Sequence, residues 1–220
     1  MFRLFKATAL ALVLGIAAGC TQTASVVSEP LQPAPNAPVA YLVGSLGPKF
    51  VNLFPAQRQA LLFRKRGSQN GAMGLWTSDF KQKTSDDIQD ADGVASVFVL
   101  PLTPGDYEFY DFDLYTLVTS GQIAYSTSLS AKEKFTRSMH LEPGKAYYIG
   151  EFRSTCILQA GCAFLWRNEM ARDGVIAKRQ HPQMPALQFL PLDLTGTGPF
   201  FIDDTPGKGL APKVADESRP

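Results

Sequence analysis

The sequence predicts a mainly β domain of the β-sandwich class with one short helix toward its C-terminal end. Apolar side chains between residues 39 and 200 recur mostly at every second position, which is the period of a half-buried strand. The chain contains 15 Phe, and aromatic residues are common in strands. It also contains 18 Gly and 16 Pro, which supply the many turns that a series of short strands requires.

Alternating or wholly apolar segments mark three strands in the first half of the domain. A strand that is covered on both faces is apolar at both parities, and the segment VASVFVLPL has this pattern. The expected strands are 39–46, 60–66 and 94–102.

The next segment, GDYEFYDFDLYTLV at 105–118, is a long aromatic strand whose apolar face changes side. The residues of one face are Tyr107 and Phe109, and those of the other are Tyr110, Phe112 and Leu114. A strand that changes its apolar face contains a bulge or bend, so we expect a bulge near Phe109 and Tyr110. Asp111 and Asp113 then point away from the Phe112 face, on the outer side of the strand.

Tight turns and one helix complete the domain. Pro104-Gly105 and Pro143-Gly144 each mark a turn before an aromatic strand. Further strands are expected at 135–141 and 146–153. The segment 167–180 is the expected helix, with Asn168 as its N-cap and His181-Pro182 as its end.

The first 19 residues predict a secretory signal peptide. Arg3 and Lys6 precede the apolar run 7–18, and small residues lead from it to Cys20. This run is too short to cross a hydrocarbon layer of about 30 Å, which takes ~20 helical residues. The segment Ala17-Ala18-Gly19-Cys20 resembles the lipobox of bacterial lipoproteins.

The lipobox resemblance implies cleavage before Cys20, attachment of lipid (palmitate among it) to this cysteine, and an anchor in a membrane. The residue after the cysteine is Thr21 and not Asp, which by resemblance to enteric lipoproteins implies transport to the outer membrane of a Gram-negative bacterium. The alternative is ordinary signal cleavage with an unmodified Cys20.

Two segments poor in apolar residues flank the domain. Residues 20–38 contain four prolines and predict a tether that carries the lipidated cysteine. Residues 201–220 predict a disordered tail. The β-sandwich domain is therefore expected to span 39–200.

The two turn-and-strand segments LPLTPGDYEF (100–109) and HLEPGKAYYIGEF (140–152), followed by a helix that ends in His-Pro, resemble a loose group of uncharacterised bacterial lipoproteins. The resemblance covers about residues 90–185 and implies an immunoglobulin-like or transthyretin-like β-sandwich. Its motifs are turns, so it implies no activity.

The charge of the chain excludes functions that depend on long-range attraction to phosphates. The net charge is +1, and removal of the signal peptide leaves 19 basic and 20 acidic residues. A nearly neutral protein lacks the field that draws proteins to nucleic acid, so we expect no nucleic-acid partner.

Cys156 and Cys162 are expected to form a disulfide, because a secreted protein matures in an oxidising compartment. Two free thiols are the alternative. The spacing is not that of a redox C-x-x-C motif, and no His cluster lies nearby in the sequence to complete a zinc site.

Three other groups of residues are candidates for chemical sites. Asp90-x-Asp92-Gly93 partly matches a calcium loop, although a solvated loop explains it as well, and we expect no metal. His140 is expected to face water and His181 to lie at the end of the helix. Neither histidine belongs to a catalytic motif, so we expect no catalytic residue and no cofactor.

The aromatic strand offers a surface on which sugars or peptides could stack, with core packing as the alternative use of the same residues. The residues of this candidate ligand surface are Tyr107, Phe109, Tyr110 and Tyr115.

These observations lead to one expected function and two alternatives. We expect a non-catalytic envelope lipoprotein that presents loops or an edge strand of its sandwich to an envelope protein partner, in the periplasm or at the cell surface. A small-molecule or glycan-binding lipoprotein is the first alternative, and an envelope hydrolase is the second.

Overall fold

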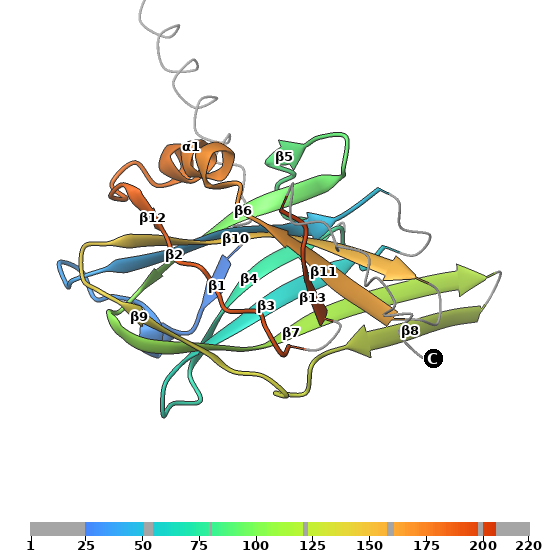
Figure 1. Cartoon of the computed structure of the whole chain (residues 1–220), viewed down its shortest axis with the longest axis horizontal. Coiled ribbons are helices and arrows are strands. Elements are labelled where there is room, and N and C mark those ends of the chain that lie inside the picture. The colour runs from blue at the N-terminus through green and yellow to red at the C-terminus, as the bar shows by residue number, and fades with distance from the viewer. Residues whose placement is uncertain are drawn as a thin grey trace, which may run out of the picture.

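The structure is a computed structural model that describes residues 25–50, 55–79, 81–120, 123–157, 161–197 and 200–205. It consists of two β-sheets and one α-helix (Figure 1), which confirms the mainly β fold class. The finer assignment to an immunoglobulin-like or transthyretin-like type stays a prediction. The predicted signal peptide at 1–19, Cys20 and the part of the predicted tail beyond residue 205 lie outside the described residues.

Sheet A has six strands within the described residues, in the order β1-β4-β3-β7-β8, with β9 also paired to β7. All its pairings are antiparallel. The strands are β1 (Ser25–Val27), β3 (Arg58–Lys65), β4 (Gly71–Thr77), β7 (Gly105–Ser120), β8 (Ile123–Leu129) and β9 (Arg137–Leu141).

Sheet B has seven strands within the same residues, in the order β13-β11-β10-β2-β6-β5, with β12 also paired to β10. It is a mixed sheet, because β10 pairs in parallel with β2 and with β12. The strands are β2 (Ala40–Pro48), β5 (Ile88–Gln89), β6 (Val94–Leu102), β10 (Ala146–Ile157), β11 (Gly161–Arg167), β12 (Leu187–Phe189) and β13 (Phe201–Asp203).

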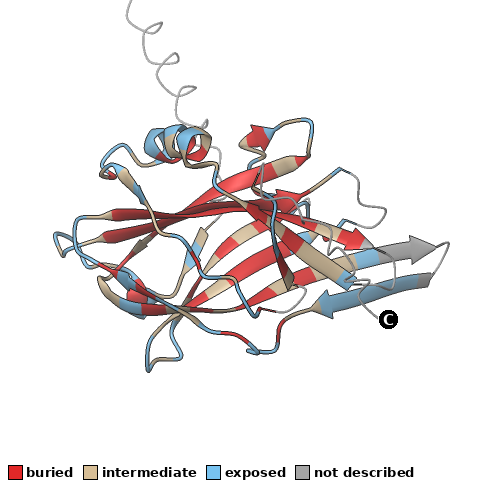
Figure 2. Cartoon of the chain, in the orientation of Figure 1, coloured by how far each residue is buried: buried red, intermediate tan, exposed pale blue. Residues whose placement is uncertain are grey.

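The main core lies between the two sheets and is built from phenylalanine rings. Phe63 of sheet A meets Phe98 of sheet B with ring centroids 6.4 Å apart. Figure 2 shows that buried residues are concentrated in the middle of the strands of both sheets. The alternation of apolar and polar residues in the sequence therefore corresponds to a sandwich in which each sheet buries one face against the other.

Phe201 shows that the domain extends past its predicted end at residue 200. This residue was expected in a disordered tail, but its side chain is buried and β13 pairs with β11. Its ring lies within 6.1 Å of five other phenylalanine rings, namely Phe109, Phe112, Phe135, Phe152 and Phe164. Phe201, together with Phe200, which packs against Phe112 (5.2 Å between ring centroids), thus holds the segment in the core.

The N-terminal boundary also lies earlier than expected. Residues 20–38 were expected to form a tether, yet β1 pairs with β4 from Ser25 onward. The short 3₁₀ helix η1 (Glu29–Leu31) follows, and the side chain of Leu31 is 2% exposed in the main core. The prediction of a tether is therefore wrong from residue 25 onward, because Val27 and Leu31, on either side of Pro30, pack against the main core and make residues 32–38 a connection within the domain.

The expected bulge in the long aromatic strand is confirmed at Tyr110. Leu62 of β3 pairs with Asp111, and the next residue, Phe63, pairs with Phe109, so Tyr110 is the additional residue. The bulge lets Phe109 and Phe112 both enter the core.

The helix α1 (Met170–Gln180) covers the outer face of sheet B (Figure 1). It begins three residues later than expected, because Arg167 is still paired with Glu151 in the sheet. The N-cap residue is Glu169 and not Asn168 as expected, because the helix begins later. Asn168 lies one residue before the N-cap, and its Oδ1 accepts a hydrogen bond from the backbone N–H of Met170 (3.1 Å). The helix ends before His181, as expected.

Candidate functional site

A two-stranded ribbon projects from sheet A at one end of the sandwich (Figure 1). Strand β3 accompanies β7 as far as Tyr115, which pairs with Arg58. Beyond this point β8 is the strand partner of β7 among the described residues, with pairs from Thr116↔Thr127 to Ser120↔Ile123. We call residues 116–120 and 123–127 the ribbon.

Strand β8 presents a free edge along the ribbon. Within the described residues it pairs with β7 and with no other strand. Every residue from 124 to 128 is exposed (Figure 2), and Tyr125 is 63% exposed. Every second residue of such an edge strand turns its N–H and C=O groups outward, where another strand can pair with them.

The chemistry of this edge is unusual for an exposed strand. Residues 114–131 contain no Asp, Glu, Lys or Arg. Natural proteins protect exposed edges with charged side chains, proline or bulges. Strand β8 (IAYSTSL) has neither a charge nor a proline, so neither of these protections is present on its edge, which no other described strand covers.

Asp111 holds the base of the ribbon in place. Its Oδ1 accepts hydrogen bonds from the backbone N–H groups of Phe112 and Ala131, both at 2.8 Å. Its Oδ2 accepts another from Glu133 N–H at 3.3 Å. The sequence predicted Asp111 on an outer strand face; the loop after β8 covers that face, so this carboxylate is buried, whereas Asp113 remains outside and bonds Arg58.

The predicted aromatic ligand surface does not form as a unit. Tyr107 and Phe109 are fully buried in the main core, which is the alternative use that the sequence left open. Tyr110 and Tyr115 lie on the outer face of sheet A, under the guanidinium groups of Arg64 (4.5 Å) and Arg58 (5.7 Å). The stacking positions on these two tyrosines are thus occupied by arginine.

The acidic run at 85–93 is part of an ion-pair cluster beneath α1. Asp90 accepts hydrogen bonds from Arg153 (2.8 Å) and Arg172 (3.3 Å), and Asp92 accepts one from Arg167 (2.9 Å). Guanidinium groups therefore stand where a calcium ion would have to bind. No group of three potential metal ligands occurs in the part of the chain that the structure describes.

Glu151 lies at the centre of this cluster and is fully buried. It accepts hydrogen bonds from Arg153 (2.7 Å), Arg172 (2.7 Å) and Arg167 (2.5 Å). Burial alone would raise the pKa of this carboxyl, but Arg153 and Arg172 outweigh the burial, so the pKa of Glu151 lies below its ordinary value. Glu151 is therefore held as an anion.

Asp173 connects the same cluster to the helix. Its Oδ2 accepts hydrogen bonds from Ser45 (2.5 Å) and Tyr148 (2.6 Å), and its Oδ1 accepts one from Arg172 (2.8 Å). Burial raises the pKa of Asp173 although Arg172 opposes the shift. All these bonds join protein groups to each other, so the arrangement fixes α1 on sheet B.

The bulge at Gly150 explains why these charges share one face. The pairing of β10 with β2 shifts register between Tyr148 and Glu151, so both residues point toward the helix. Gly150 has φ +125°, and a Cβ there would lie 2.1 Å from Nε1 of Trp166. Glycine is required at this position for both reasons.

The two histidines lie on separate elements and make different contacts. His140 on β9 is exposed, as expected, and its Nδ1 lies 2.7 Å from Oδ1 of Asp106. His181 follows α1, where burial lowers the pKa of its imidazole. Neither imidazole hydrogen-bonds a Ser or Cys side chain among the described residues, which is the contact that a hydrolytic triad needs.

The expected disulfide is present between Cys156 and Cys162. It joins the directly paired positions at the ends of β10 and β11. Cys20, the predicted lipidation site, lies outside the described residues.

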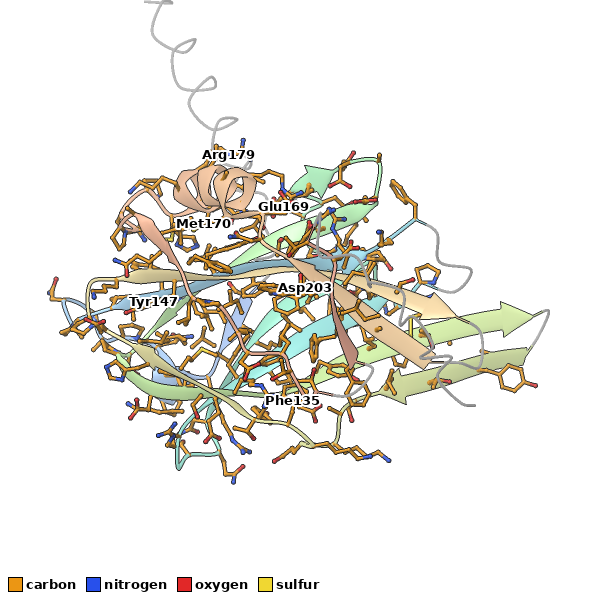
Figure 3. The ribbon with its side chains drawn as sticks, in the orientation of Figure 1. Phe135, Tyr147, Glu169, Met170, Arg179 and Asp203 are labelled. Atoms are coloured by element: carbon orange, nitrogen blue, oxygen red, sulfur yellow. A yellow bond between two sulfur atoms is a disulfide. The ribbon has the colours of Figure 1, made fainter. Side chains whose placement is uncertain are left out.

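An open apolar groove of about 680 Å³ runs beside α1. The helix contributes Met170 and Val175, and the segment 184–187 forms the opposite wall. In Figure 3, Met170 lies on the side of α1 toward sheet B and Arg179 on the side away from it. Val175 is 70% exposed, so this groove is a shallow surface and not an enclosed cavity.

Helices long and apolar enough to cross a membrane do not occur in the described residues. Comparisons with protein-family models, curated proteins and solved structures found no match.

The sequence predicts an edge strand in general terms but does not locate it. The available signal was the absence of charge over residues 114–131, which extends past the predicted end of the strand at 118. The chain has 41 charged residues among 220, so a long stretch without any charge, rich in Thr, Ser and Tyr, differs from the rest of the sequence in composition. The alternation of apolar residues alone does not reveal this difference.

Proposed function

We propose that the protein is a non-catalytic lipoprotein of the bacterial cell envelope that binds a partner by pairing strands at the free edge of β8. The sequence supports the anchor through the signal peptide at 1–19 and the lipobox-like residues before Cys20. Two or more acyl chains on one cysteine hold a protein stably at a membrane. By resemblance to enteric lipoproteins, that membrane is the outer membrane.

The observation that carries the proposal is the ribbon. An isolated two-stranded hairpin is at best marginally stable in water, and a third strand is what makes such a unit stable. The ribbon has exposed residues along β8 and no charge, so an added strand gains hydrogen bonds without removing a charge from water. The edge is therefore suited to accept an extended segment.

The ion-pair cluster supports a binding module over an envelope hydrolase. Its buried carboxylates, Glu151 and Asp173, accept hydrogen bonds from arginines, and they lie beneath α1 and not in a pocket. A carboxylate held in this way has no access to a substrate.

A second candidate is binding of an apolar small molecule in the groove beside α1. The groove is lined by Met170, Val175 and Leu187, which favours an apolar ligand over a glycan. Its open shape gives less burial than a carrier needs, so we rank it behind the ribbon.

The test is site-specific crosslinking in a Gram-negative host. A photoreactive amino acid replaces Tyr125 on the ribbon or, as matched control, Val175 on α1; the two side chains are 63% and 70% exposed. We expect a discrete crosslinked band from position 125 only, and its loss in a Cys20→Ala chain that is no longer anchored. Equal products from both positions, or none from position 125, would refute the binding role of the ribbon.

The anchor is tested separately by metabolic labelling with an alkyne analogue of palmitate. We expect the label on the intact chain and none on Cys20→Ala. Equal labelling of both chains would contradict acylation at Cys20.

A further inference from the structure

We propose that the partner strand is the same strand of a second copy of this chain, so that two ribbons join edge to edge about a two-fold axis. This inference rests on the proposed role of the ribbon as a strand-pairing edge. It adds the identity of the partner and the register of the pairing.

The sequence of β8 is compatible with antiparallel pairing to itself. With the two-fold axis at Ser126, Ala124 lies opposite Ser128 of the other copy, and Tyr125 lies opposite Thr127. One face then carries only small residues, and the other carries an aromatic residue beside a β-branched one, which is a favourable cross-strand pair. Because of the two-fold axis, each of these two cross-strand pairs occurs twice in the interface.

The missing charges favour a second copy in particular. When a strand pairs with itself, any charge near the axis meets an equal charge, which destabilises the pair. No Asp, Glu, Lys or Arg occurs between residues 114 and 131, so this penalty is absent. Two other edge strands carry a charge, since β13 ends in Asp203 and β9 begins with Arg137. The edge strands β1, β5 and β12 are uncharged, but they have only two or three residues each and offer a much shorter edge than β8.

Pairing would also complete the fold of the ribbon. Each copy supplies β7 and β8, and the order β7-β8-β8-β7 gives four antiparallel strands across the interface. A four-stranded unit exceeds the three strands at which a sheet becomes stable in water. The interface uses the same surface on both copies, as in the commonest kind of homodimer.

Disulfide trapping tests this arrangement in the full-length, membrane-bound chain. Ser126→Cys places two thiols at the two-fold axis, where directly opposed Cα atoms are about 4.5–5.5 Å apart, within the range that a disulfide bridges. The native Cys156 and Cys162 are already bonded to each other. Val175→Cys is the matched exposed control.

We expect mild oxidation to convert the Ser126→Cys chain, and not the Val175→Cys chain, into a band of twice the monomer mass that reductant reverses. A mixed disulfide with a different protein would overturn the second-copy inference and leave the strand-pairing function in place. Absence of any product, together with no photocrosslink at position 125, would overturn both.

A charge exchange separates loss of pairing from loss of folding. One variant carries Ser126→Lys and Ser128→Lys, and the other carries Ser126→Glu and Ser128→Glu. Each variant alone is expected not to pair, so that it co-purifies with a differently tagged copy of itself no more than an untagged control does. Lysine and glutamate chains expressed together are expected to co-purify again. Failure of the mixture to restore pairing, with both chains folded by circular dichroism, would refute the proposal.

Discussion

Replacing Glu151 by glutamine removes the one carboxylate that three arginines share. Glutamine keeps the size of the side chain but not its charge. Arg153 is 1% exposed, so its guanidinium group stays buried, with Asp90 as its remaining carboxylate partner. Removing one member of a buried ion pair typically costs about 3–5 kcal/mol, because the other charge is left uncompensated.

We therefore expect Glu151→Gln to lower the free energy of unfolding by about 3–5 kcal/mol. For a domain of this size, each kcal/mol lowers Tm by roughly 2–4 °C, so the expected decrease in Tm is roughly 6–20 °C. Urea unfolding of the full-length chain at pH 7, followed by tryptophan fluorescence, measures the change. Trp166 reports on the region directly, because it precedes Arg167 in β11.

The matched control is Glu133→Gln. Glu133 also bonds an arginine, Arg64 (3.1 Å), but its side chain is 57% exposed. Exposed ion pairs contribute about 0–1 kcal/mol, so this variant should unfold close to the wild type. If the two variants differ by less than about 1 kcal/mol, the buried network does not stabilise the attachment of α1 as argued.

Three further predictions concern the pH dependence of stability, Asp111 and the disulfide. Because the pKa of Glu151 is lowered by folding, its charge stabilises the fold fully above the unfolded pKa of 4.5, and this stabilisation is lost as pH falls through the folded pKa. Asp173 has a raised pKa and acts in the opposite sense. Glu151→Gln should therefore flatten the acid side of a plot of unfolding free energy against pH. Asp111→Ala removes the acceptor of three backbone N–H groups, so it should lower the free energy of unfolding by about 1–3 kcal/mol and speed proteolysis in the loop after β8. Asp113→Ala, the control, should do neither. Replacing both Cys156 and Cys162 by serine should cost about 2.4 kcal/mol in chemical denaturation, and reductant should have the same effect on the wild type but none on the variant.

The sequence predicted the features of the fold that depend on local pattern. The change of parity between Phe109 and Phe112 located the bulge at Tyr110, and His181-Pro182 located the end of α1. Both are readable because neighbouring residues alone determine them.

Features that depend on distant partners were missed. Asp111 reads as an outward residue by alternation, and only the loop that returns over it makes it buried. Likewise β1 is three residues long, too short for any period, and exists because β4 offers an edge. Glu151 and Arg153 would have pointed into the core without the bulge at Gly150, which the pattern AYYIGEFR does not reveal.

The pairing of β1 with β4 limits how far the domain can move from an anchored cysteine. Five peptide steps separate Cys20 from Ser25, and fully extended they reach about 18 Å, whereas a tether to residue 38 would reach about 65 Å. With the proposed acyl anchor, the sandwich is confined to a thin layer next to the bilayer. Neighbouring copies then meet by lateral diffusion at nearly the same distance from the membrane surface. The number of molecules per membrane area, and not their concentration per volume, would therefore set the fraction of ribbons that are paired.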